Sequence, residues 1–202
     1  MERNIDELNL LFYKKYFEPM ALSERQKEKR IKAARIFEDI LYSFIMLVSL
    51  DPEFGIDQTT KEILLEEYAD AVREFIDDPD FVTMYVALLA AFIEETTIKN
   101  MGQEYNTSYQ RAMDLAADQA NTVCNREEFI EFSIAGYKRK QWITEHDDKV
   151  RESHFEVEDV IVPINDFFVV GNAIMRFPHD FEYAYDHPEE TVNCRCSLAY
   201  LR

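Results

Sequence analysis

The first half of the chain places apolar residues at helical spacing. Residues 1–17 carry apolar side chains three or four positions apart, which predicts a first helix. The same spacing returns from Ile31 to Val48, after Ser23 and Gln26 in a capping-box arrangement and before Pro52. The pattern therefore predicts two amphipathic helices, the second one long and ended by Pro52.

Two more helices are predicted before residue 100. Thr59 and Glu62 form a second capping-box pattern ahead of an apolar stripe. Asp78 followed by Pro79 is an N-cap with proline at the first helical position. The helix that Pro79 opens is apolar on nearly every side as far as Ile93, which is typical of the buried centre of a helical bundle.

A segment of small and polar residues, 100–107, separates these helices from the rest of the chain. Beyond it we expect helices over 111–121 and 125–136, the second capped by Asn125 with Glu128. Lys138, Arg139 and Lys140 then stand where cations favour a helix C-terminus. The segment predicts a domain boundary, with a helical region over 1–103 and a second domain over 104–202.

The pattern changes after Gly136. Short runs rich in β-forming residues alternate with turn residues, which predicts strands near 142–144, 157–164, 167–170 and 196–201. The predicted fold class is α+β: an N-terminal helical bundle followed by a small α+β domain with short β-strands at the C-terminus.

Charge narrows the range of partners. The chain has 22 Lys and Arg against 40 Asp and Glu, a net charge of −18. Residues 1–50 hold 9 basic and 8 acidic side chains, so the remaining residues carry 13 minus 32, or −19. A surface this acidic disfavours non-specific DNA binding, which depends on Lys and Arg replacing counterions, so any DNA contact must be local.

The chain has neither a predicted membrane segment nor a signal-peptide pattern at its start. Its longest apolar run, Phe81 to Ile93, has thirteen residues, whereas a membrane span needs roughly 20. Charged residues occupy the first positions where a signal peptide would be apolar. We therefore expect no membrane partner and a cytoplasmic site of production.

One stretch is basic. Glu24 to Arg35 contains six basic and two acidic residues. Such a run is most often the solvated face of a helix. The alternative is a docking surface for an acidic partner or a strand of DNA, with Lys27, Lys29, Arg30 and Lys32 as the candidate contacts.

Histidine and cysteine gather in the last sixty residues. Three cysteines, two of them one residue apart, make a poor disulfide framework and indicate a reducing compartment. A zinc site would use His154, Cys194 and Cys196 with His179 or His187 as the fourth ligand. Structural zinc sites usually draw on C-x2-C turns, so the alternative is that both cysteines pack on one face of the last strand, with Arg195 on the other.

Acid and base groups give a further hypothesis. If residues 147–154 are helical, Asp147, Arg151 and His154 share one face, and Asp147 pairs with Arg151. A hydrolase or nuclease would use Asp147 or Asp166 to hold a hard cation and His154 as general base. The sequence has no G-x-S-x-G, H-E-x-x-H or P-loop pattern. A structural role for these residues is therefore the preferred interpretation.

An ordered set of residues carries a resemblance to a known family. The pattern W-x-T-x-x-D-x-x-V-R-x-x-H, followed some forty residues later by N-C-R-C, resembles the signature of the phage head-morphogenesis family. These are minor head proteins similar to protein F of phage Mu. The resemblance covers residues 104–202, and the residues that match are Trp142, Thr144, Asp147, Arg151, His154, Asn193, Cys194, Arg195 and Cys196.

The resemblance implies a low-copy structural component of a phage or prophage head. Such a protein lies inside the procapsid, binds the portal protein and contacts the major capsid or scaffold protein, after production in the host bacterial cytoplasm. It implies no settled enzymatic activity and no cofactor beyond the zinc considered above. Many members carry Arg-Thr-Glu in the helix before the tryptophan, whereas this chain has Ala116-Ala117-Asp118-Gln119.

The alternative function is enzymatic. Similar domains occur fused to toxin domains, nucleases among them. A metal-dependent hydrolase or nuclease, or a toxin-related transferase, would then use His154, Asp147 and the cysteines Cys194 and Cys196.

Overall fold

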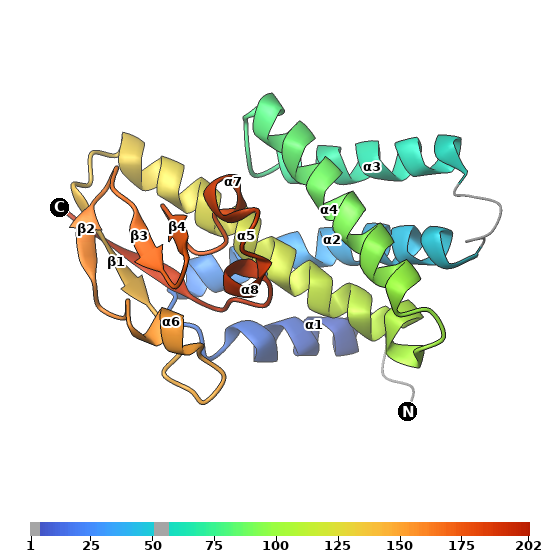
Figure 1. Cartoon of the computed structure of the whole chain (residues 1–202), viewed down its shortest axis with the longest axis horizontal. Coiled ribbons are helices and arrows are strands. Elements are labelled where there is room, and N and C mark those ends of the chain that lie inside the picture. The colour runs from blue at the N-terminus through green and yellow to red at the C-terminus, as the bar shows by residue number, and fades with distance from the viewer. Residues whose placement is uncertain (1–4, 51–56) are drawn as a thin grey trace. The chain divides into compact units, whose positions relative to one another are not determined.

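Helices account for the first two thirds of the chain and short strands for the remainder, as Figure 1 shows. The structure is a computed structural model, and it describes residues 5–50 and 57–202. The α+β class predicted from the sequence is confirmed, with helices first and short antiparallel strands at the C-terminal end.

The chain divides into two compact units whose borders fall inside helices. The helical unit comprises Met1–Leu10 and Ile31–Ala117, and the mixed unit comprises Leu11–Arg30 and Asp118–Arg202. This division differs from the predicted one at residue 103, because residues 11–30 join the C-terminal part of the chain through buried contacts of Arg30 described below.

The long helices follow the predicted order. They are α1 (Ile5–Phe17), α2 (Glu24–Leu50), α3 (Gln58–Arg73) and α4 (Pro79–Lys99), followed by the 3-10 turn η1 (Glu104–Thr107) and α5 (Tyr109–Ile134). Pro52, predicted to end the second helix, lies outside the described residues.

Two of the four predicted helix N-caps are confirmed in detail. The backbone N–H of Ser23 donates to Gln26 Oε1 at 3.0 Å, and the N–H of Gln26 faces Ser23 Oγ at 3.4 Å. Asp78 accepts a hydrogen bond from the N–H of Phe81 at 3.1 Å. The capping box at Thr59 is wrong, because the N-cap of α3 is Asp57, two residues earlier.

In the helical unit, aromatic and aliphatic side chains form the core. The ring of Phe37 lies 5.0 Å from that of Tyr68, and the rings of Phe81 and Tyr85 stack at 5.5 Å. The hydroxyls of Tyr68 and Tyr85 lie 3.3 Å apart, so the phenolic groups satisfy one another inside an apolar contact.

Helix α4 is less buried than predicted, because Met84 and Leu88 are 37% and 42% exposed. By length and composition it is also apolar enough to cross a membrane, with a mean hydropathy of 1.5 over eighteen residues. The sequence prediction of no such segment counted only the uninterrupted run to Ile93, whereas the helix continues to Lys99. A core helix of a helical bundle has the same composition.

The mixed unit contains a three-stranded antiparallel sheet in the order β2-β1-β5 and a separate β3-β4 hairpin. The strands are β1 (Arg139–Ile143), β2 (Ile161–Pro163), β3 (Phe168–Val170), β4 (Ala173–Met175) and β5 (Ser197–Leu201). Three single-turn helices join them: α6 (Glu152–Phe155), α7 (Phe181–Ala184) and α8 (Pro188–Thr191).

Register in this sheet places Trp142 of β1 opposite Leu198 of β5. Both are buried in one apolar cluster that also holds Phe168, Cys194 and Cys196. Because successive strand residues alternate between faces, Lys140 lies on the same face of β1 as Trp142 and is buried with it.

Three local predictions in this part of the chain are wrong. The two helices predicted over 111–121 and 125–136 are one helix, α5 (Tyr109–Ile134), because Asn125 directs its side chain to the carbonyl of Pro178 instead of capping. Residues 147–151 are not helical, since α6 begins only at Glu152. Lys140 stands in a strand and not at a helix end.

Candidate functional site

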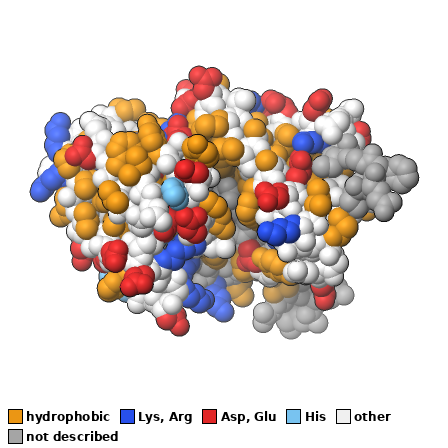
Figure 2. Space-filling view, viewed as in Figure 1, with side chains coloured by type: hydrophobic (Ala, Val, Ile, Leu, Met, Phe, Trp, Pro, Cys, Tyr) orange, Lys and Arg blue, Asp and Glu red, His pale blue; other side chains and the backbone are white. Residues whose placement is uncertain are grey.

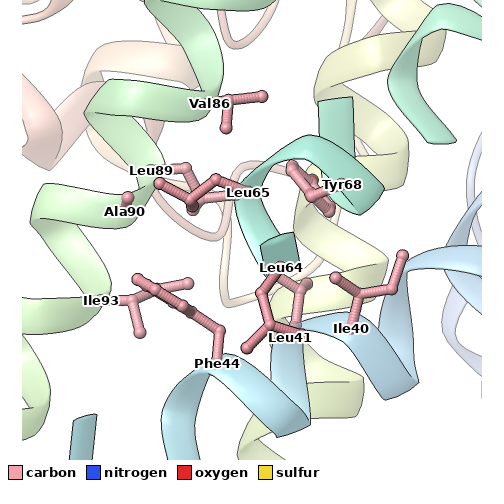
Figure 3. Close-up of a pocket in the computed structure, with 10 residues that line it drawn as sticks. All are labelled: Ile40, Leu41, Phe44, Leu64, Leu65, Tyr68, Val86, Leu89, Ala90 and Ile93. Atoms are coloured by element: carbon pink, nitrogen blue, oxygen red, sulfur yellow. The ribbon is translucent and has the colours of Figure 1, made fainter. Parts of the chain in front are cut away.

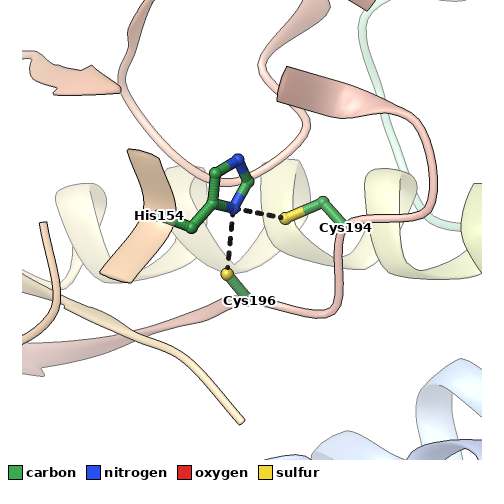
Figure 4. Close-up of side chains that lie close together, drawn as sticks. All are labelled: His154, Cys194 and Cys196. Carbon is green, nitrogen blue, oxygen red and sulfur yellow. Dashed lines mark hydrogen bonds between the residues drawn. The ribbon is translucent and has the colours of Figure 1, made fainter. Parts of the chain in front are cut away.

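His154, Cys194 and Cys196 meet at one point of the mixed unit, as Figure 4 shows. Nδ1 of His154 lies 3.3 Å from Sγ of Cys196 and 3.5 Å from Sγ of Cys194. All three side chains are buried, and their ligating atoms lie within 4.8 Å of one another. In the described part of the chain, no other group of His, Cys, Asp and Glu side chains is arranged closely enough to hold a metal ion.

The backbone before β5 brings both sulfurs to the same imidazole. Asn193 has φ 56°, a left-handed conformation that asparagine tolerates better than most residues. After this turn, Cys194 and Cys196 reach His154, while the guanidinium of Arg195 contacts both oxygens of Asp147 at 2.7 and 2.8 Å. With the C-x-C spacing, both sulfurs therefore face His154, whereas the charged side chain of Arg195 between them contacts Asp147.

Two further groups lie close to the imidazole of His154. Its ring meets the buried ring of Trp142 edge-on, with centroids 5.7 Å apart. Nε2 lies 3.2 Å from Oε2 of Glu190, and the same oxygen accepts a hydrogen bond of 2.7 Å from Ser153. Neutral imidazole carries one proton: on Nδ1 it is donated toward the sulfurs, and on Nε2 it faces Glu190 and leaves the Nδ1 lone pair toward the sulfurs.

Gly171 makes room for Glu190. Its φ is +58°, and a Cβ atom at this position would overlap the carboxylate of Glu190. The turn between β3 and β4 therefore requires glycine both for its backbone conformation and for the carboxylate that faces His154.

The pKa values of the two thiols are shifted in opposite directions. Burial acts to raise the pKa of Cys194, but hydrogen bonds from Cys196, His154 and His179 outweigh it and bring that pKa well below its usual value. The hydrogen bond from Cys194, together with burial, raises the pKa of Cys196. The pair therefore favours one thiolate, on Cys194, stabilised by a neighbouring thiol.

A second histidine supports the segment that carries the cysteines. Nε2 of His179 donates a short hydrogen bond to the carbonyl oxygen of Cys194, and Nδ1 lies 3.8 Å from Oδ1 of Asp118. Burial acts to lower the pKa of His179, but Asp118 and Cys194 outweigh it and raise it to about 9. Burial raises the pKa of Asp118 to about 6, so the two groups form an ion pair at neutral pH.

The predicted fourth zinc ligands lie elsewhere. Both ring nitrogens of His179 are engaged, because Nδ1 also lies 3.1 Å from the hydroxyl of Thr122. His187 faces Glu189 at 3.1 Å and Asp186 at 3.8 Å. The His and Cys side chains that the structure brings together are therefore three and not four.

Arg30 joins the start of α2 to the same backbone segment. Its guanidinium is fully buried and contacts Glu128 at 2.6 Å, Asn121 at 2.8 Å and Asn125 at 2.7 Å. Asn121 in turn donates to the carbonyl of Cys194 at 3.1 Å. This network explains why residues 11–30 belong to the mixed unit.

The four predicted docking residues differ in how exposed they are to a partner. Arg30 is buried and cannot contact a partner, which corrects that prediction. Lys27 donates to the carbonyl of Glu18 at 2.8 Å, and Lys29 forms an ion pair with Glu127. Lys32 has the most exposed side chain of the four, at 63%, and lies 3.1 Å from Glu74.

The predicted pair of Asp147 with Arg151 is wrong. Asp147 pairs with Arg195, which is the main reason why its pKa is lowered. Arg151 instead donates to the carbonyl of Val192. Thr144 is buried, and its backbone N–H donates to Glu158 at 2.7 Å. Each of these contacts fixes a loop around the cluster, and Asp147 is not placed with His154 as a cation ligand.

Asp166, the other predicted cation ligand, is associated with a different buried group. The charge of Asp180 and, to a smaller extent, that of Asp166 act on Lys140, whose ammonium lies 4.7 Å from the ring centre of Phe129 and 5.5 Å from that of Phe168. Burial lowers the pKa of Lys140 to about 8. This lysine is held by aromatic faces in the core of the mixed unit.

A pocket opens beside the cluster. It encloses about 250 Å³ of space that includes open solvent. Burial raises the pKa of Glu145 in its wall to about 7. The arrangement places an imidazole, two thiols, a carboxyl group and two guanidinium groups around one space. The lining residues are Glu145, Lys149, Val150, Arg151, His154, Asn193, Cys194, Arg195 and Cys196.

The helical unit has a pocket of a different kind, shown in Figure 3. It measures about 230 Å³ including open solvent, and aliphatic and aromatic side chains from α2, α3 and α4 line it. Its lining contains no carboxylate, amine, imidazole or thiol. This pocket therefore offers shape and apolar surface but no reactive group.

Comparisons with protein-family models, with curated proteins and with solved structures find no match for this chain. Any function must therefore be argued from its own residues and their geometry.

Several residues around the cluster were not selected from the sequence. Asp118 enters the sequence analysis only where the chain departs from the family pattern, and Glu190 is not among the candidate residues. One signal was present: polar residues recur along one buried face of α5 at helical spacing, where apolar ones are expected. These residues are Asp118, Asn121, Thr122, Asn125 and Glu128.

Proposed function

We propose that the chain is a phage minor head protein, a low-copy structural component that binds the portal protein and supports head assembly. The observation that carries this proposal is the convergence of the family-like residues. Trp142, His154 and the C-x-C segment are far apart in the sequence and form one buried cluster. An ordered signature that folds into one centre favours a shared family fold over chance agreement.

The signature residues act chiefly on architecture in this proposal. Trp142 and His154 pack together, Arg151 and Arg195 each fix a loop, and Asn193 sets the turn before the cysteines. Buried polar contacts of this kind specify one arrangement of loops. A stiff mixed unit suits a component that must keep its shape inside a procapsid.

The surface is consistent with protein partners. Figure 2 shows acidic side chains scattered over the visible face among hydrophobic and uncharged ones. With a net charge of −18, the chain is expected to contact the portal protein, and the major capsid or scaffold protein, rather than coat DNA. In this proposal it resides in the virion interior after production in the host cytoplasm.

The pocket beside the cluster favours a second candidate function. A metal-dependent hydrolase or nuclease, or a toxin-related transferase, would use His154 and the cysteines facing that pocket. The two candidates predict different variants. If the role is architectural, His154→Ala lowers the melting temperature and assembly together; if it is catalytic, the variant folds normally and loses turnover.

Affinity capture tests the proposal directly. The tagged chain is expressed with its native gene neighbourhood, captured from the lysate, and its partners are identified by mass spectrometry with and without about 0.5 M salt. We expect the portal protein in the eluate, and a loss at high salt would identify an electrostatic contact. Recovery of the tagged chain alone would contradict the proposed function.

A further inference from the structure

The spacing of three buried side chains fits a metal ion. In a tetrahedral site with Zn–S bonds of about 2.3 Å and Zn–N bonds of about 2.05 Å, sulfur and nitrogen ligands lie about 3.5 Å apart. The two distances from Nδ1 of His154 to the sulfurs are 3.3 and 3.5 Å. Both nitrogen-to-sulfur distances thus match the edges of such a tetrahedron, and all three ligand atoms lie within 4.8 Å of one another.

Hydrogen bonding leaves part of this group unpaired in one of the two tautomers of His154. With its proton on Nε2, His154 has a single Nδ1 lone pair, which lies in the ring plane and points at two sulfurs at once. Only one S–H can point along that lone pair. A cation bound between the three atoms uses the nitrogen lone pair and one lone pair from each sulfur.

Glu190 completes a further feature of metal-binding histidines. A ligating imidazole usually turns its other nitrogen toward a carboxylate, which fixes the tautomer and the ring orientation. Here Nε2 of His154 lies 3.2 Å from Glu190, which Ser153 holds by a hydrogen bond of 2.7 Å. Gly171 leaves space for that carboxylate, so the orientation is built into the fold.

From this geometry we propose that His154, Cys194 and Cys196 bind one Zn²⁺ ion and leave its fourth position open to the adjacent pocket. Thiolate and imidazole ligands select zinc over calcium or magnesium. All three ligands line the pocket, and both other candidate histidines have partners elsewhere. Three protein ligands with one exchangeable position distinguish an open zinc site from a closed structural one.

The binding step is balanced by proton release. The two cysteines enter as thiols or thiolates and end as thiolates, so each proton that remains on sulfur leaves to solvent as a Zn–S bond forms. Water takes the fourth position and is the ligand that a small anion replaces. The ion would join α6 to the segment before β5 and so extends the proposed architectural role of these residues. Zinc binding can be tested whether or not the chain assembles with a portal protein.

Metal content is the first test. The full chain is purified under reducing conditions, incubated with zinc, desalted, and measured by elemental analysis. We expect about one zinc per chain, as one three-ligand site requires. Cys194→Ala and Cys196→Ala should each lower this severalfold, whereas Cys124→Ala, which alters a buried cysteine of α5 outside the cluster, should leave it unchanged.

The conservative variant Glu190→Gln keeps the shape of the side chain that faces His154. We expect its zinc affinity to fall about 10- to 100-fold with the fold retained. Circular dichroism verifies folding of every variant, so a lost metal is not confused with a lost structure. Less than about a tenth of an equivalent in the wild-type chain, or equal zinc content in the cysteine variants, would overturn the site.

Cobalt tests the open position separately. Substitution with Co²⁺ should give a thiolate-to-cobalt charge-transfer band together with visible bands of four-coordinate cobalt. Added azide should shift the visible bands if the fourth ligand exchanges. A cobalt spectrum that azide leaves unchanged would contradict the open position, and a Cys194–Cys196 disulfide found by mass spectrometry in the reduced protein would contradict the site as a whole.

Discussion

The two units of this chain are stabilised by different interiors. The core of the helical unit consists mainly of aliphatic and aromatic side chains, with the Tyr68 and Tyr85 hydroxyls paired inside it. Glu38 and Arg111 are its buried charged groups among the described residues. The mixed unit buries a guanidinium, an ammonium and two imidazoles beside its apolar cluster, on Arg30, Lys140, His154 and His179. Truncating a side chain in an apolar interior leaves a cavity. Truncating one partner of a buried ion pair leaves the other charge buried without a partner, which costs more free energy of unfolding.

The largest difference between the units should follow from Arg30→Ala. The substitution leaves the buried carboxylate of Glu128 without its guanidinium and removes contacts to Asn121 and Asn125. We expect the free energy of unfolding to fall by about 3–5 kcal/mol, measured by urea denaturation. Lys32→Ala is the matched control on the same helix, and because its ion pair is exposed it should cost less than about 1 kcal/mol. Equal effects of the two variants would refute the distinction.

A cavity substitution probes the helical unit. Leu41 is 2% exposed and lines the apolar pocket. Leu41→Ala should lower the free energy of unfolding by about 2–4 kcal/mol, because the pocket enlarges and its walls collapse only in part. Leu50→Ala, at a position 74% exposed in the same helix, should change it little. A small effect at Leu41 would show that packing around the pocket does not stabilise this unit.

Lys140 gives the mixed unit a pH dependence in the alkaline range. Its folded pKa of about 8 lies below the usual value for lysine, near 10.4 in the unfolded chain. Between these values the unfolded chain binds more protons, so stability contributed by this group rises as pH rises. We expect a gain on the order of 1–3 kcal/mol between about pH 8 and 10.

Lys140→Met isolates that effect. Methionine fills similar space between Phe129 and Phe168 without a charge, so the variant should lose the rise in stability at alkaline pH. Chemical denaturation at a series of pH values measures it. Parallel pH profiles for wild type and variant would contradict the assignment to Lys140.

The smallest effect is expected at the rim of the cluster. Asp147 is exposed and pairs with Arg195, so Asp147→Asn should cost less than about 1 kcal/mol. Zinc content should not change, because Asp147 is not one of the three clustered ligands. A marked loss of bound zinc in this variant would show that Asp147 is also a zinc ligand.

The sequence predicted the helical unit better than the mixed unit for a physical reason. Periodic apolar residues and local caps such as Asp78 determine where helices begin and which side is buried, and both are properties of neighbouring residues. Even here, the border between the units was missed, because it depends on Arg30 meeting Glu128 some hundred residues later. No local pattern encodes that contact.

The cluster itself could be selected from the sequence, but its surroundings could not. His154, Cys194 and Cys196 are rare residue types in a short stretch, which made them candidates. The pairing of Asp147 was mistaken because helical spacing was assumed for a segment that is not helical. Glu190 carries no signal of its own, since its role depends on α8 and Gly171 bringing the carboxylate to an imidazole.

The central claim is that residues spread over the C-terminal signature form one interdependent centre. A double-mutant cycle between His154→Ala and Cys196→Ala, followed by chemical denaturation of the reduced protein, measures this most directly. Residues in one network couple, so the account predicts an interaction energy of at least about 1 kcal/mol between the two substitutions. Effects that add to within about 0.5 kcal/mol would contradict it.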